Sequence, residues 1–441
     1  MKRDGFPVWC ARALSRGLLV AACVRCAPSR AAEAQPPPVT LAALSCLAAE
    51  AETELRGNIL PFWISNARDP IRGGFHSFIG EDMAVRDDLP RGALLTSRIL
   101  WTFSAAYRRY RDPKYLEMAQ WAYRDLVDRF LDRERGGLFW TVSADGRPVD
   151  AHKQVYGQAF GIYGLSEYYR ATGDRGALER AIAIYSLVEE HAHDKEHGGY
   201  FDSLTREWRR ERGRGNLLGD APKSQNSHIH ILEGFTNLLR VWPDEGLRRR
   251  QRELIELTLS RIIDPATHHL VLFMGDDWEP IGRGVSYGHD IELSWLLVEA
   301  ADVQGDPGLL ERARREAVAI ARVTNAQGVD ADGGVFSEGN QAGPTNRDKE
   351  WWEQAEAPVG FLDAYQISGD PAFLSDAMRS WRFIQDKVVD RVHGDWYDTL
   401  KRDGTPLARG TKLSVWKCPY HNSRSCMELI DRCRELSGAS P

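Results

Sequence analysis

The stretch Glu134–Trp140, ERGGLFW, sets the architecture of this 441-residue chain. Two adjacent glycines adopt positive φ at little steric cost, and the large apolar residues after them favour a short strand, so the stretch predicts a tight hairpin. Related stretches recur at intervals of 61–71 residues. Six copies at one period indicate a repeat architecture. They are centred on Gly73-Gly74, Gly136-Gly137, Gly198-Gly199, a degenerate His269-Leu270, Gly333-Gly334 and Gly394-Asp395.

A second signal, an aspartate at a turn, alternates with the hairpins. Asp112-Pro113, Asp306-Pro307 and Asp370-Pro371 each place an N-capping aspartate before a proline at the first helical position. Gly173-Asp174 and Pro243-Asp244 occupy the equivalent places in two further units. Each unit therefore reads as a helix, a hairpin, a second helix and a turn. This pattern predicts an all-α toroid of twelve helices in six pairs, with short β-hairpins.

Apolar residues at helical spacing place the twelve helices along the chain. In the last of them, Ser425 and Glu428 have capping-box spacing, which puts the helix start near Asn422–Ser425 and His421 just ahead of it. The expected ranges are Thr40–Asn66, Leu89–Tyr110, Pro113–Leu131, Gln154–Ala171, Ala177–Ala192, Lys223–Val241, Leu247–Ile263, Val285–Val303, Leu309–Thr324, Lys349–Tyr365, Pro371–Val389 and Leu413–Leu436.

The N-terminus differs from the rest in composition. Lys2 and Arg3 precede a broken apolar run and the motif Ala32-Glu33-Ala34, so residues 1–34 resemble a secretory signal. A proline-rich linker at 35–39 and one catalytic domain at 40–441 would follow. This pattern predicts a periplasmic or secreted protein. The alternatives are a lipid anchor at Cys23, or a cytoplasmic protein whose start codon is misassigned.

Charge and cysteine usage narrow the function classes. The net charge is −6 and no basic stripe is present, which argues against nucleic-acid binding. No other stretch is long and apolar enough to span a membrane. Four of the seven cysteines lie beyond residue 34, lack zinc-type spacing and are expected to be mostly buried thiols, with a disulfide left open. These four are Cys46, Cys418, Cys426 and Cys433.

The helix after each hairpin carries one polar or aromatic group that stands out from its surroundings. Taken singly, several also fit a structural role, such as a surface arginine or a core aromatic stripe. In a ring of helix pairs, however, one helix of each pair lines the lumen, so groups on alternate helices would converge on one cavity. The six groups are Arg98, Tyr156, His230, His289, Trp352 and His421.

Helical geometry separates two neighbouring histidines. His230 shares one face with Asn226, Glu233 and Asn237, at spacings of four, three and four residues. His228 is two positions away and therefore points roughly 200° from His230. We expect His230 to face the lumen.

Three further features of the expected lumen follow from spacing. His289 and Glu292 are three residues apart on one helical face and are expected to pair, which would fix the imidazole tautomer. The dipole of the last helix would keep His421 neutral. Of the adjacent Trp351 and Trp352, one is expected in the core and one against a ligand, because two adjacent helical residues do not face the same way.

Three neutral histidines and an arginine, without a clear nucleophile or phosphate loop, suit proton transfer beside a carbonyl. Opening a reducing sugar exposes an aldehyde, which acidifies the neighbouring C2–H. Removal of that proton gives an enediolate whose charge Arg98 could bind. Epimerisation then needs a base on each face of C2, and a third acid/base would open and close the ring.

Six segments together resemble the cellobiose 2-epimerases of the N-acylglucosamine 2-epimerase superfamily. The resemblance spans about Glu52 to Leu436 and implies an (α/α)6 barrel that converts the reducing-end glucose of cellobiose or lactose to mannose, or mannobiose in reverse, without a cofactor or metal. The segments are SRILWTFSAAY (Ser97–Tyr107), VYGQAF (Val155–Phe160), NSHIHILE (Asn226–Glu233), SYGHDIELSWLL (Ser286–Leu297), EWWEQAEA (Glu350–Ala357) and WKCPYHNSR (Trp416–Arg424).

The resemblance also implies roles for individual residues. His230 and His421 would exchange the C2 proton, and His289 would assist ring opening. Arg98 would stabilise the enediolate. Two features depart from the family: Glu353 stands where a proline is expected, and Gly219–Gln225 is an unfamiliar approach to the histidine helix. The sugars would be oriented by Tyr156, Asn226, Glu292, Trp352 and Trp416.

Several rival functions stay open at this point. An aldose–ketose isomerase of the mannose/fructose type or an N-acylglucosamine 2-epimerase would use the same scaffold. A glycoside hydrolase would need two opposed carboxylates, and a metal hydrolase would use His230, His289 and His421 as ligands. A non-catalytic sugar- or protein-binding member is the remaining alternative. The expected partner is a disaccharide, the expected state is a monomer, and the sequence leaves the preferred disaccharide open.

Overall fold

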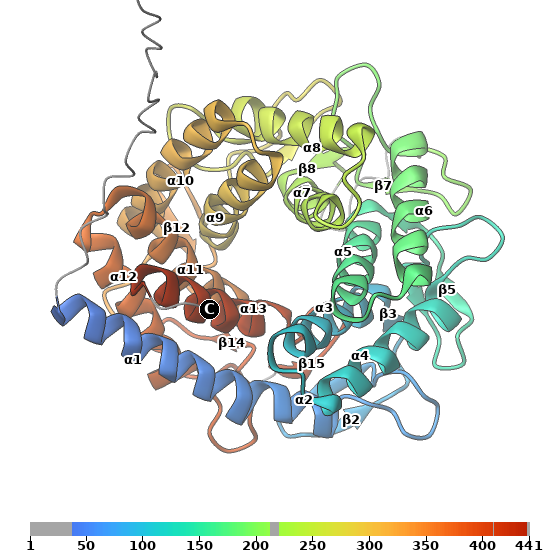
Figure 1. The fold of residues 1–441 in the computed structure, drawn as a ribbon, viewed down its shortest axis with the longest axis horizontal. Helices are drawn as coiled ribbons and strands as arrows, with labels where there is room; N and C mark the ends of the chain where they lie inside the picture. The colour runs from blue at the N-terminus through green and yellow to red at the C-terminus, as the bar shows by residue number, and fades with distance from the viewer. Residues whose placement is uncertain (1–37, 212–219, 409, 439–441) are drawn as a thin grey trace, which may run out of the picture.

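The computed structural model describes residues 38–211, 220–408 and 410–438, which form a ring of helix pairs (Figure 1). The expected signal segment at 1–34 lies outside the described residues, as do residues 35–37 of the expected linker and three of the cysteines. The unfamiliar approach at Gly219–Gln225 is described from residue 220 onward. Among the described helices, none is both long and apolar enough to cross a membrane.

Six helices, one from each repeat unit, surround the centre of the ring. Each packs against the next, and the last packs against the first, so the inner layer is closed. These inner helices are α3 (Ala93–Tyr110), α5 (Val155–Thr172), α7 (Gln225–Leu239), α9 (Tyr287–Gln304), α11 (Trp351–Ser368) and α13 (Tyr420–Leu436).

Six outer helical rods cover the inner layer, and each packs against an inner helix. Four of the rods contain a π-helical turn, labelled η. The twelve rods of the described chain confirm the predicted six helix pairs and the (α/α)6 fold. The outer rods are α1–η1–α2 (Pro38–Glu54, Leu55–Ile59, Leu60–Asn66), α4–η2 (Pro113–Asp125, Leu126–Phe130), α6 (Arg175–His191), α8–η3 (Glu245–Leu257, Thr258–Ile262), α10 (Pro307–Gly328) and α12–η4 (Pro371–Phe383, Ile384–Val388).

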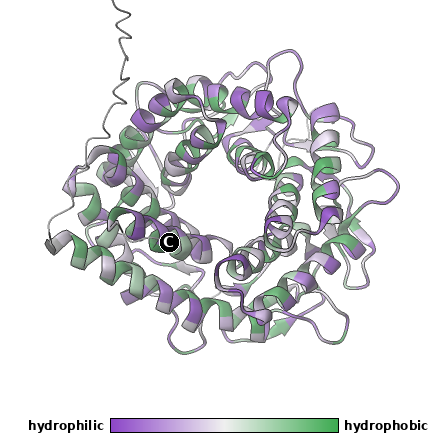
Figure 2. Ribbon diagram, in the orientation of Figure 1, coloured by the Kyte–Doolittle hydropathy of each residue, from purple (hydrophilic) through white to green (hydrophobic). Residues whose placement is uncertain are grey.

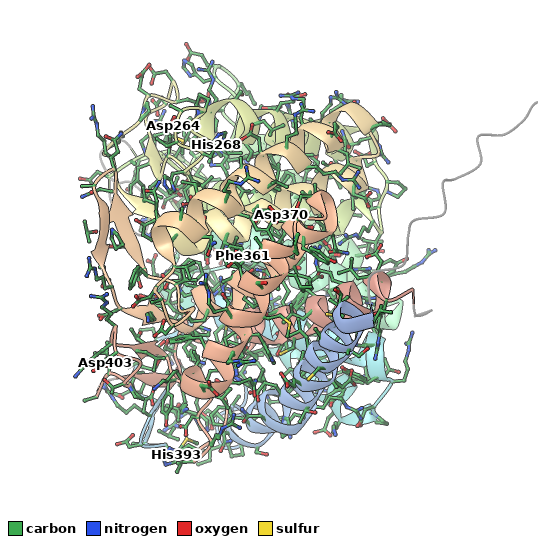
Figure 3. All side chains as sticks on the ribbon, turned by 90° about the vertical axis from the view of Figure 1, so that its left-hand side faces the viewer. Asp264, His268, Phe361, Asp370, His393 and Asp403 are labelled. Atoms are coloured by element: carbon green, nitrogen blue, oxygen red, sulfur yellow. The ribbon has the colours of Figure 1, made fainter. Side chains whose placement is uncertain are left out.

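In the described part of the chain, short antiparallel strands form six small sheets between the helices of the ring. In the side view, residues of the hairpin segments such as Asp264, His393 and Asp403 lie toward one end, and Asp370, in the turn after α11, lies away from them (Figure 3). The strands are β1 (Phe78–Gly80), β2 (Val85–Arg86), β3 (Arg91–Gly92), β4 (Thr141–Val142), β5 (Pro148–Asp150), β6 (Lys153–Gln154), β7 (Ser203–Leu204), β8 (Lys223–Ser224), β9 (Phe273–Met274), β10 (Val285–Ser286), β11 (Glu338–Asn340), β12 (Gly343–Asn346), β13 (Lys349–Glu350), β14 (Thr399–Leu400) and β15 (Thr411–Leu413).

The last inner helix departs most from the sequence prediction. Residues 411–413 form β15, and α13 begins at Tyr420, ahead of the predicted start near Asn422–Ser425. The predicted capping box is wrong, because the buried Ser425 hydroxyl has no hydrogen-bond partner. His421 therefore lies in the first turn of α13 instead of just ahead of it. Four other inner helices start one to two residues later than predicted, because the residues before them pair in β6, β8, β10 and β13.

The hairpin turns have the backbone conformation that their glycines predict. Gly136 and Gly137 have φ of +71° and +67°, and a Cβ on Gly137 would lie 2.5 Å from the Trp208 ring. The degenerate copy is shifted by one residue from the prediction. The bridge Ile263–Leu270 corresponds to Leu131–Leu138 of the second unit, so its turn pair is His268-His269. His268 has φ of +60°, which a non-glycine residue adopts at some cost.

An ion pair with a buried cation fastens the hairpin to the segment before the next inner helix in five of the six units. Lys153 Nζ lies 3.0 Å from Asp132 Oδ2, and Lys223 Nζ lies 2.7 Å from Asp194 Oδ2. The fourth unit has Val285 at the equivalent position, so its hairpin aspartate has no such partner. We call these pairs the hairpin locks. The five locks are Arg91–Asp69, Lys153–Asp132, Lys223–Asp194, Lys349–Asp330 and Lys412–Asp390.

Hydrophobic packing between the two helix layers completes the scaffold. Hydrophilic residues dominate the connecting loops at the rim of the ring (Figure 2). Three of the four described cysteines are buried and the fourth, Cys46, is exposed, and all four are free thiols. The prediction of mostly buried thiols is therefore confirmed, and the described cysteines form no disulfide.

Candidate active site

A cavity of about 380 Å³ lies between the inner helices and the loop that carries β14 and β15. All nine residues that the sequence singled out line it. They are Arg98, Tyr156, Asn226, His230, His289, Glu292, Trp352, Trp416 and His421. The other lining residues are Glu350, Trp351, Asp398, Thr399, Thr411 and Ser414. Groups from six repeat units thus meet in one pocket.

The lining groups lie at two depths along the inner helices. His289, Trp352 and His421 come from the first turns of three consecutive helices, α9, α11 and α13. Arg98 and His230 lie one turn further along α3 and α7. The cavity therefore has an outer layer, with two histidines around an indole, and an inner layer with an arginine and a histidine.

Arg98 is a buried cation without a carboxylate partner among the described residues. Its Nη2 donates to Tyr156 Oη at 2.7 Å, and its Nη1 lies 3.5 Å from the Trp416 carbonyl oxygen. The guanidinium carbon stands 4.3 Å from the centre of the Phe160 ring, and Nε has no hydrogen-bond partner. A buried guanidinium that no carboxylate neutralises attracts an anion, so Arg98 is suited to an oxyanion in the cavity.

Two of the three histidines are held by carboxylates. His230 Nδ1 lies 3.0 Å from Glu233 Oε2, and His421 Nδ1 lies 2.7 Å from Glu356 Oε1. A carboxylate accepts from Nδ1–H, so this pairing leaves the Nε2 lone pair as the free base. Burial, reinforced by the cations Arg98 and Arg424, holds the pKa of His421 well below its usual range.

His289 is held differently from the prediction. Its Nδ1 lies 2.8 Å from the Ser286 hydroxyl, so the expected pair with Glu292 is wrong. The cause is that Glu292 turns to Arg424, whose Nη2 donates to Glu292 Oε1 at 2.7 Å. Burial lowers the pKa of His289 to about 3, with help from His230 and Arg98, so this imidazole is neutral at physiological pH.

The indole of Trp352 lies beside both outer histidines. Its ring centre lies 4.6 Å from His289 and 5.7 Å from His421, and its Nε1 donates to Glu350 Oε2 at 2.7 Å. Trp351 also lines the cavity, although it is only 6% exposed. Trp351 is nevertheless part of the hydrophobic core, which confirms the expectation that one of the two indoles lies there. The contact of the less buried Trp352 with a ligand stays a prediction. Both stand in the first turn of α11, where the chain enters the lumen from β13.

Trp416 and Asn226 complete the outer layer, and the family departure Glu353 lies outside the cavity lining. The Trp416 indole is 38% exposed and lies 6.1 Å from the Tyr156 ring. Asn226 has a buried Oδ1 without a partner among the described residues, so it can accept from a ligand hydroxyl. Glu353 caps α11, because its Oε2 accepts from the Glu350 N–H at 3.1 Å and the Ser337 hydroxyl at 3.2 Å.

Glu292 is a lining carboxyl group whose pKa is raised by its surroundings. Its Oε2 is buried without a hydrogen-bond partner. Burial and the neighbouring Glu356 raise the pKa of Glu292 to about 7. At neutral pH it therefore exchanges between an acceptor and a proton donor, which suits a group that contacts a sugar hydroxyl.

The sequence reasoning missed the group that joins these carboxylates. Arg424 contacts Glu233, Glu292 and Glu356 together. A comparison of the repeats by helix position would have found it. Arg98, Phe160, His230, Glu292 and Glu356 are each the sixth residue of an inner helix, and Arg424 is the fifth residue of α13.

Helical geometry separated the neighbouring histidines correctly. His228 points away from the lumen: its Nδ1 lies 2.7 Å from the Ser224 carbonyl oxygen, and its Nε2 accepts the Tyr200 N–H at 3.0 Å. It therefore braces a hairpin. Burial lowers its pKa to about 4, so it remains neutral.

The metal-hydrolase rival is not supported by the donor geometry. Among the described residues, His230, His289 and His421 do not bring three ligand atoms together; the cavity group that does is Glu292, Glu356 and His421. Arg424 already occupies the cationic place in that group, since its Nη2 lies 2.7 Å and 2.6 Å from the two carboxylates. A metal ion there would be a second cation beside the guanidinium.

Comparison with known proteins identifies the family to which this chain belongs. Residues 73–422 match the family described as N-acylglucosamine 2-epimerase. The chain belongs to this family. A cellobiose 2-epimerase from Bacteroides fragilis is 42% identical over 86% of this chain and 98% of the relative. The structure of a cellobiose 2-epimerase from Bacillus thermoamylovorans superposes with a TM-score of 0.83 at 37% identity, over 88% of this chain and all of that one.

A more distant likeness marks the extent of the fold. The structure of a D-mannose isomerase superposes with a TM-score of 0.77 at 20% identity, covering 88% of this chain and 97% of that one. At this identity the likeness shows the shared fold alone. The family assignment confirms the resemblance that the six sequence segments carried.

Proposed function

We propose that this family member is a disaccharide 2-epimerase that interconverts glucose and mannose at the reducing end of β-1,4-linked disaccharides such as cellobiose, lactose and mannobiose. The cellobiose 2-epimerases from Bacteroides fragilis and Bacillus thermoamylovorans support this substrate class. The observation that carries the proposal is the convergence of three histidines and the uncompensated Arg98 in one cavity. The chemistry is C2 proton transfer through a cis-enediol(ate).

The two depths of the cavity suggest how the steps are divided. The C2 proton has to be removed on one face and returned on the other, so two bases must stand at one level on either side of the sugar. His289 and His421 meet this condition, because both lie in the outer layer and flank the Trp352 indole. A sugar stacked on that indole would place C2 between them.

The groups of the inner layer then act on the oxygen atoms bonded to C1, which are the anomeric oxygen and the ring oxygen. Arg98 binds the negative charge that develops on the enediolate. His230, at the same depth and backed by Glu233, transfers the proton that opens and closes the ring. His230 and His289 thereby exchange the roles that the family resemblance implied, because His289 lies at the depth of His421 and His230 lies at the depth of Arg98.

The test is incubation with cellobiose, and with β-1,4-mannobiose, in D2O followed by NMR. We expect the C2 epimer with deuterium at C2. A ketose product would instead make the chain an aldose–ketose isomerase, and released monosaccharide would make it a hydrolase. An unchanged disaccharide after prolonged incubation would favour a binding protein.

Single histidine variants distinguish the two role assignments. With one base removed, His289→Asn and His421→Asn should each exchange C2–H for deuterium in one epimer only, without net epimerisation. His230→Asn should slow interconversion of the α and β anomers as well as epimerisation. If His230→Asn shows the one-epimer exchange and His289→Asn does not, the original assignment of His230 and His421 holds instead.

We also propose that the chain is exported and acts as a monomer. The signal-like composition of residues 1–34 supports export. N-terminal sequencing of the mature protein and size-exclusion chromatography are the measurements. A mature chain that retains residues 1–34, or a dimer at working concentration, would contradict these two points.

A further inference from the structure

One buried cation behind the cavity has no place in the proposed steps. Arg424, in the second turn of α13, is 2% exposed and does not line the cavity. Its Nη2 donates to Glu292 Oε1 at 2.7 Å and to Glu356 Oε1 at 2.6 Å. Its Nη1 contacts Glu233 Oε1 and Tyr420 Oη. One guanidinium therefore holds three carboxyl groups from three different inner helices.

Two of these carboxyl groups are the ones that hold histidines. Glu233 accepts from His230 Nδ1 and Glu356 accepts from His421 Nδ1. Arg424 thus connects two imidazoles on α7 and α13, which stand on opposite sides of the closed inner ring. His289 has Ser286 as its Nδ1 partner and lies outside this network.

We infer that Arg424 is a positioning residue that fixes His230 and His421 in the tautomer with Nε2 toward the cavity and couples their charge states. The inference rests on the proposed function, because it assigns these two histidines to successive steps of one reaction. Ring opening and C2 proton exchange would then share one electrostatic support.

The charges around Arg424 explain why a cation is needed there. Three carboxylates gathered without a cation would repel one another and take up protons. A protonated carboxyl group donates its own hydrogen bond, so it no longer selects the Nδ1–H tautomer. Arginine suits this place better than lysine, because its planar fork offers separate N–H groups to separate carboxylates.

The sign of the effect on His421 follows from the groups that face it. These groups are Glu356 on α11, Glu292 on α9, Arg424 on its own helix, Arg98 on α3, and the imidazoles of His230 and His289. A cation beside an imidazole disfavours its protonated form. A cation also disfavours the protonated form of the carboxyl groups beside it. Removal of Arg424 therefore raises the pH at which the cluster of His421, Glu292 and Glu356 takes up a proton, and the acid limb of the rate profile moves to higher pH.

The chain offers a matched control on the same helix. Arg432 lies two turns further along α13, and its guanidinium faces the same Trp295 ring, at 5.8 Å compared with 4.7 Å for Arg424. Its Nη1 donates to Asp363 Oδ1 at 2.6 Å and its Nε to Glu428 Oε2 at 3.1 Å. These carboxyl groups hold no histidine, so Arg432 shares the structural role without the positioning role.

The experiment compares the pH dependence of kcat/KM for Arg424→Gln, Arg424→Lys and Arg432→Gln, each with its melting temperature. We expect Arg424→Gln to lose about 10–100-fold in kcat, the usual cost of removing a partner behind an active-site ligand, and to move the acid limb upward. Arg424→Lys should have the acid limb at its wild-type pH, because the charge is kept, but a kcat below that of the wild type. Arg432→Gln should lower the melting temperature and leave the limb in place.

Two results would overturn the inference: an acid limb that stays in place in Arg424→Gln, or an equal shift in Arg432→Gln. If Arg424→Gln does not fold, Arg424→Lys decides, since full activity there would contradict the need for a fork. Nitrogen-15 NMR of the imidazoles in the unliganded protein gives a readout without substrate. In Arg424→Gln we expect both His230 and His421 to lose the Nδ1–H tautomer. This expectation holds even if the wild-type protein proves to have another activity.

Discussion

The hairpin locks and the cavity wall use the same six repeats in opposite ways. At the lock position, five units carry a cation paired with the hairpin aspartate, and only the fourth, with Val285, departs. At the sixth position of the first five inner helices no such rule holds: Arg98, Phe160, His230, Glu292 and Glu356 stand there, four residue types in five helices. Positions that repeat build the ring, and positions that differ between units build the site.

The largest expected effect comes from breaking a lock. In Lys223→Met, Asp194 keeps its buried charge and loses the Nζ partner at 2.7 Å, so the free energy of unfolding should fall by about 3–5 kcal/mol. Urea unfolding measures the loss, and kcat of the folded fraction should not change. The double variant Lys223→Met/Asp194→Asn should regain part of the stability. A loss below about 1 kcal/mol would show that the locks are not part of the scaffold.

A substitution in the lumen should lower kcat and leave the stability nearly unchanged, the reverse of breaking a lock. Arg98→Lys keeps the charge but loses the fork that reaches Tyr156 and the cavity, so kcat should fall about 10²–10³-fold, the cost of losing an oxyanion donor. The melting temperature should change little. Arg108→Lys, on the same helix with a half-exposed side chain, is the control and should keep kcat. Equal losses in both variants would contradict the division between scaffold and site.

The smallest expected effect tests whether repeat positions are interchangeable. His228 braces the third hairpin from the fourth position of its helix, where Gln158 and Gln354 brace the second and fifth hairpins through the Leu138 and Val335 backbones. His228→Gln should therefore be tolerated at neutral pH. Thermal melts of both proteins between pH 7 and pH 4 measure the effect.

In acid, His228→Gln should be more stable than the wild-type protein. The pKa of His228 is about 4 in the folded protein, compared with 6.5 for a free imidazole. Between these values the unfolded chain binds a proton that the folded chain does not, so wild-type stability falls as the pH falls from about 6.5 to 4. The loss reaches about 3 kcal/mol, at about 1.4 kcal/mol per pKa unit. Parallel melting curves for the two proteins would contradict this account.

The sequence was sufficient for the scaffold because the repeats average out local ambiguity. Gly73-Gly74 or Asp112-Pro113 alone would be a weak signal, but six hairpins at one period leave one arrangement. The same counting brought all nine candidate residues into one cavity. The repeat shows which helix of each pair faces inward, and this was enough to identify the residues that line the cavity.

Side-chain partners were less predictable, because they are chosen across the lumen. Spacing along α9 paired His289 with Glu292, whereas in the structure Glu292 turns to Arg424, 132 positions away. Spacing along α13 proposed a cap at Ser425, whereas the helix begins earlier because Tyr420 and Arg424 are both drawn into the carboxyl network. Contacts between units outweigh local rules where polar groups are buried.

The seam of the ring has a consequence for how the protein is made. β1 pairs with β15 through Ile79 and Leu413, and the backbone N–H of Asp395 donates to Asn58 Oδ1 at 2.8 Å. The first unit is therefore completed only by the last, so its core stays incomplete until residues 395–413 have been synthesised. A circular permutant cut in the turn between α5 and α6 would keep this joint within continuous sequence and move the closing contacts to α5, which packs against α6 and α7.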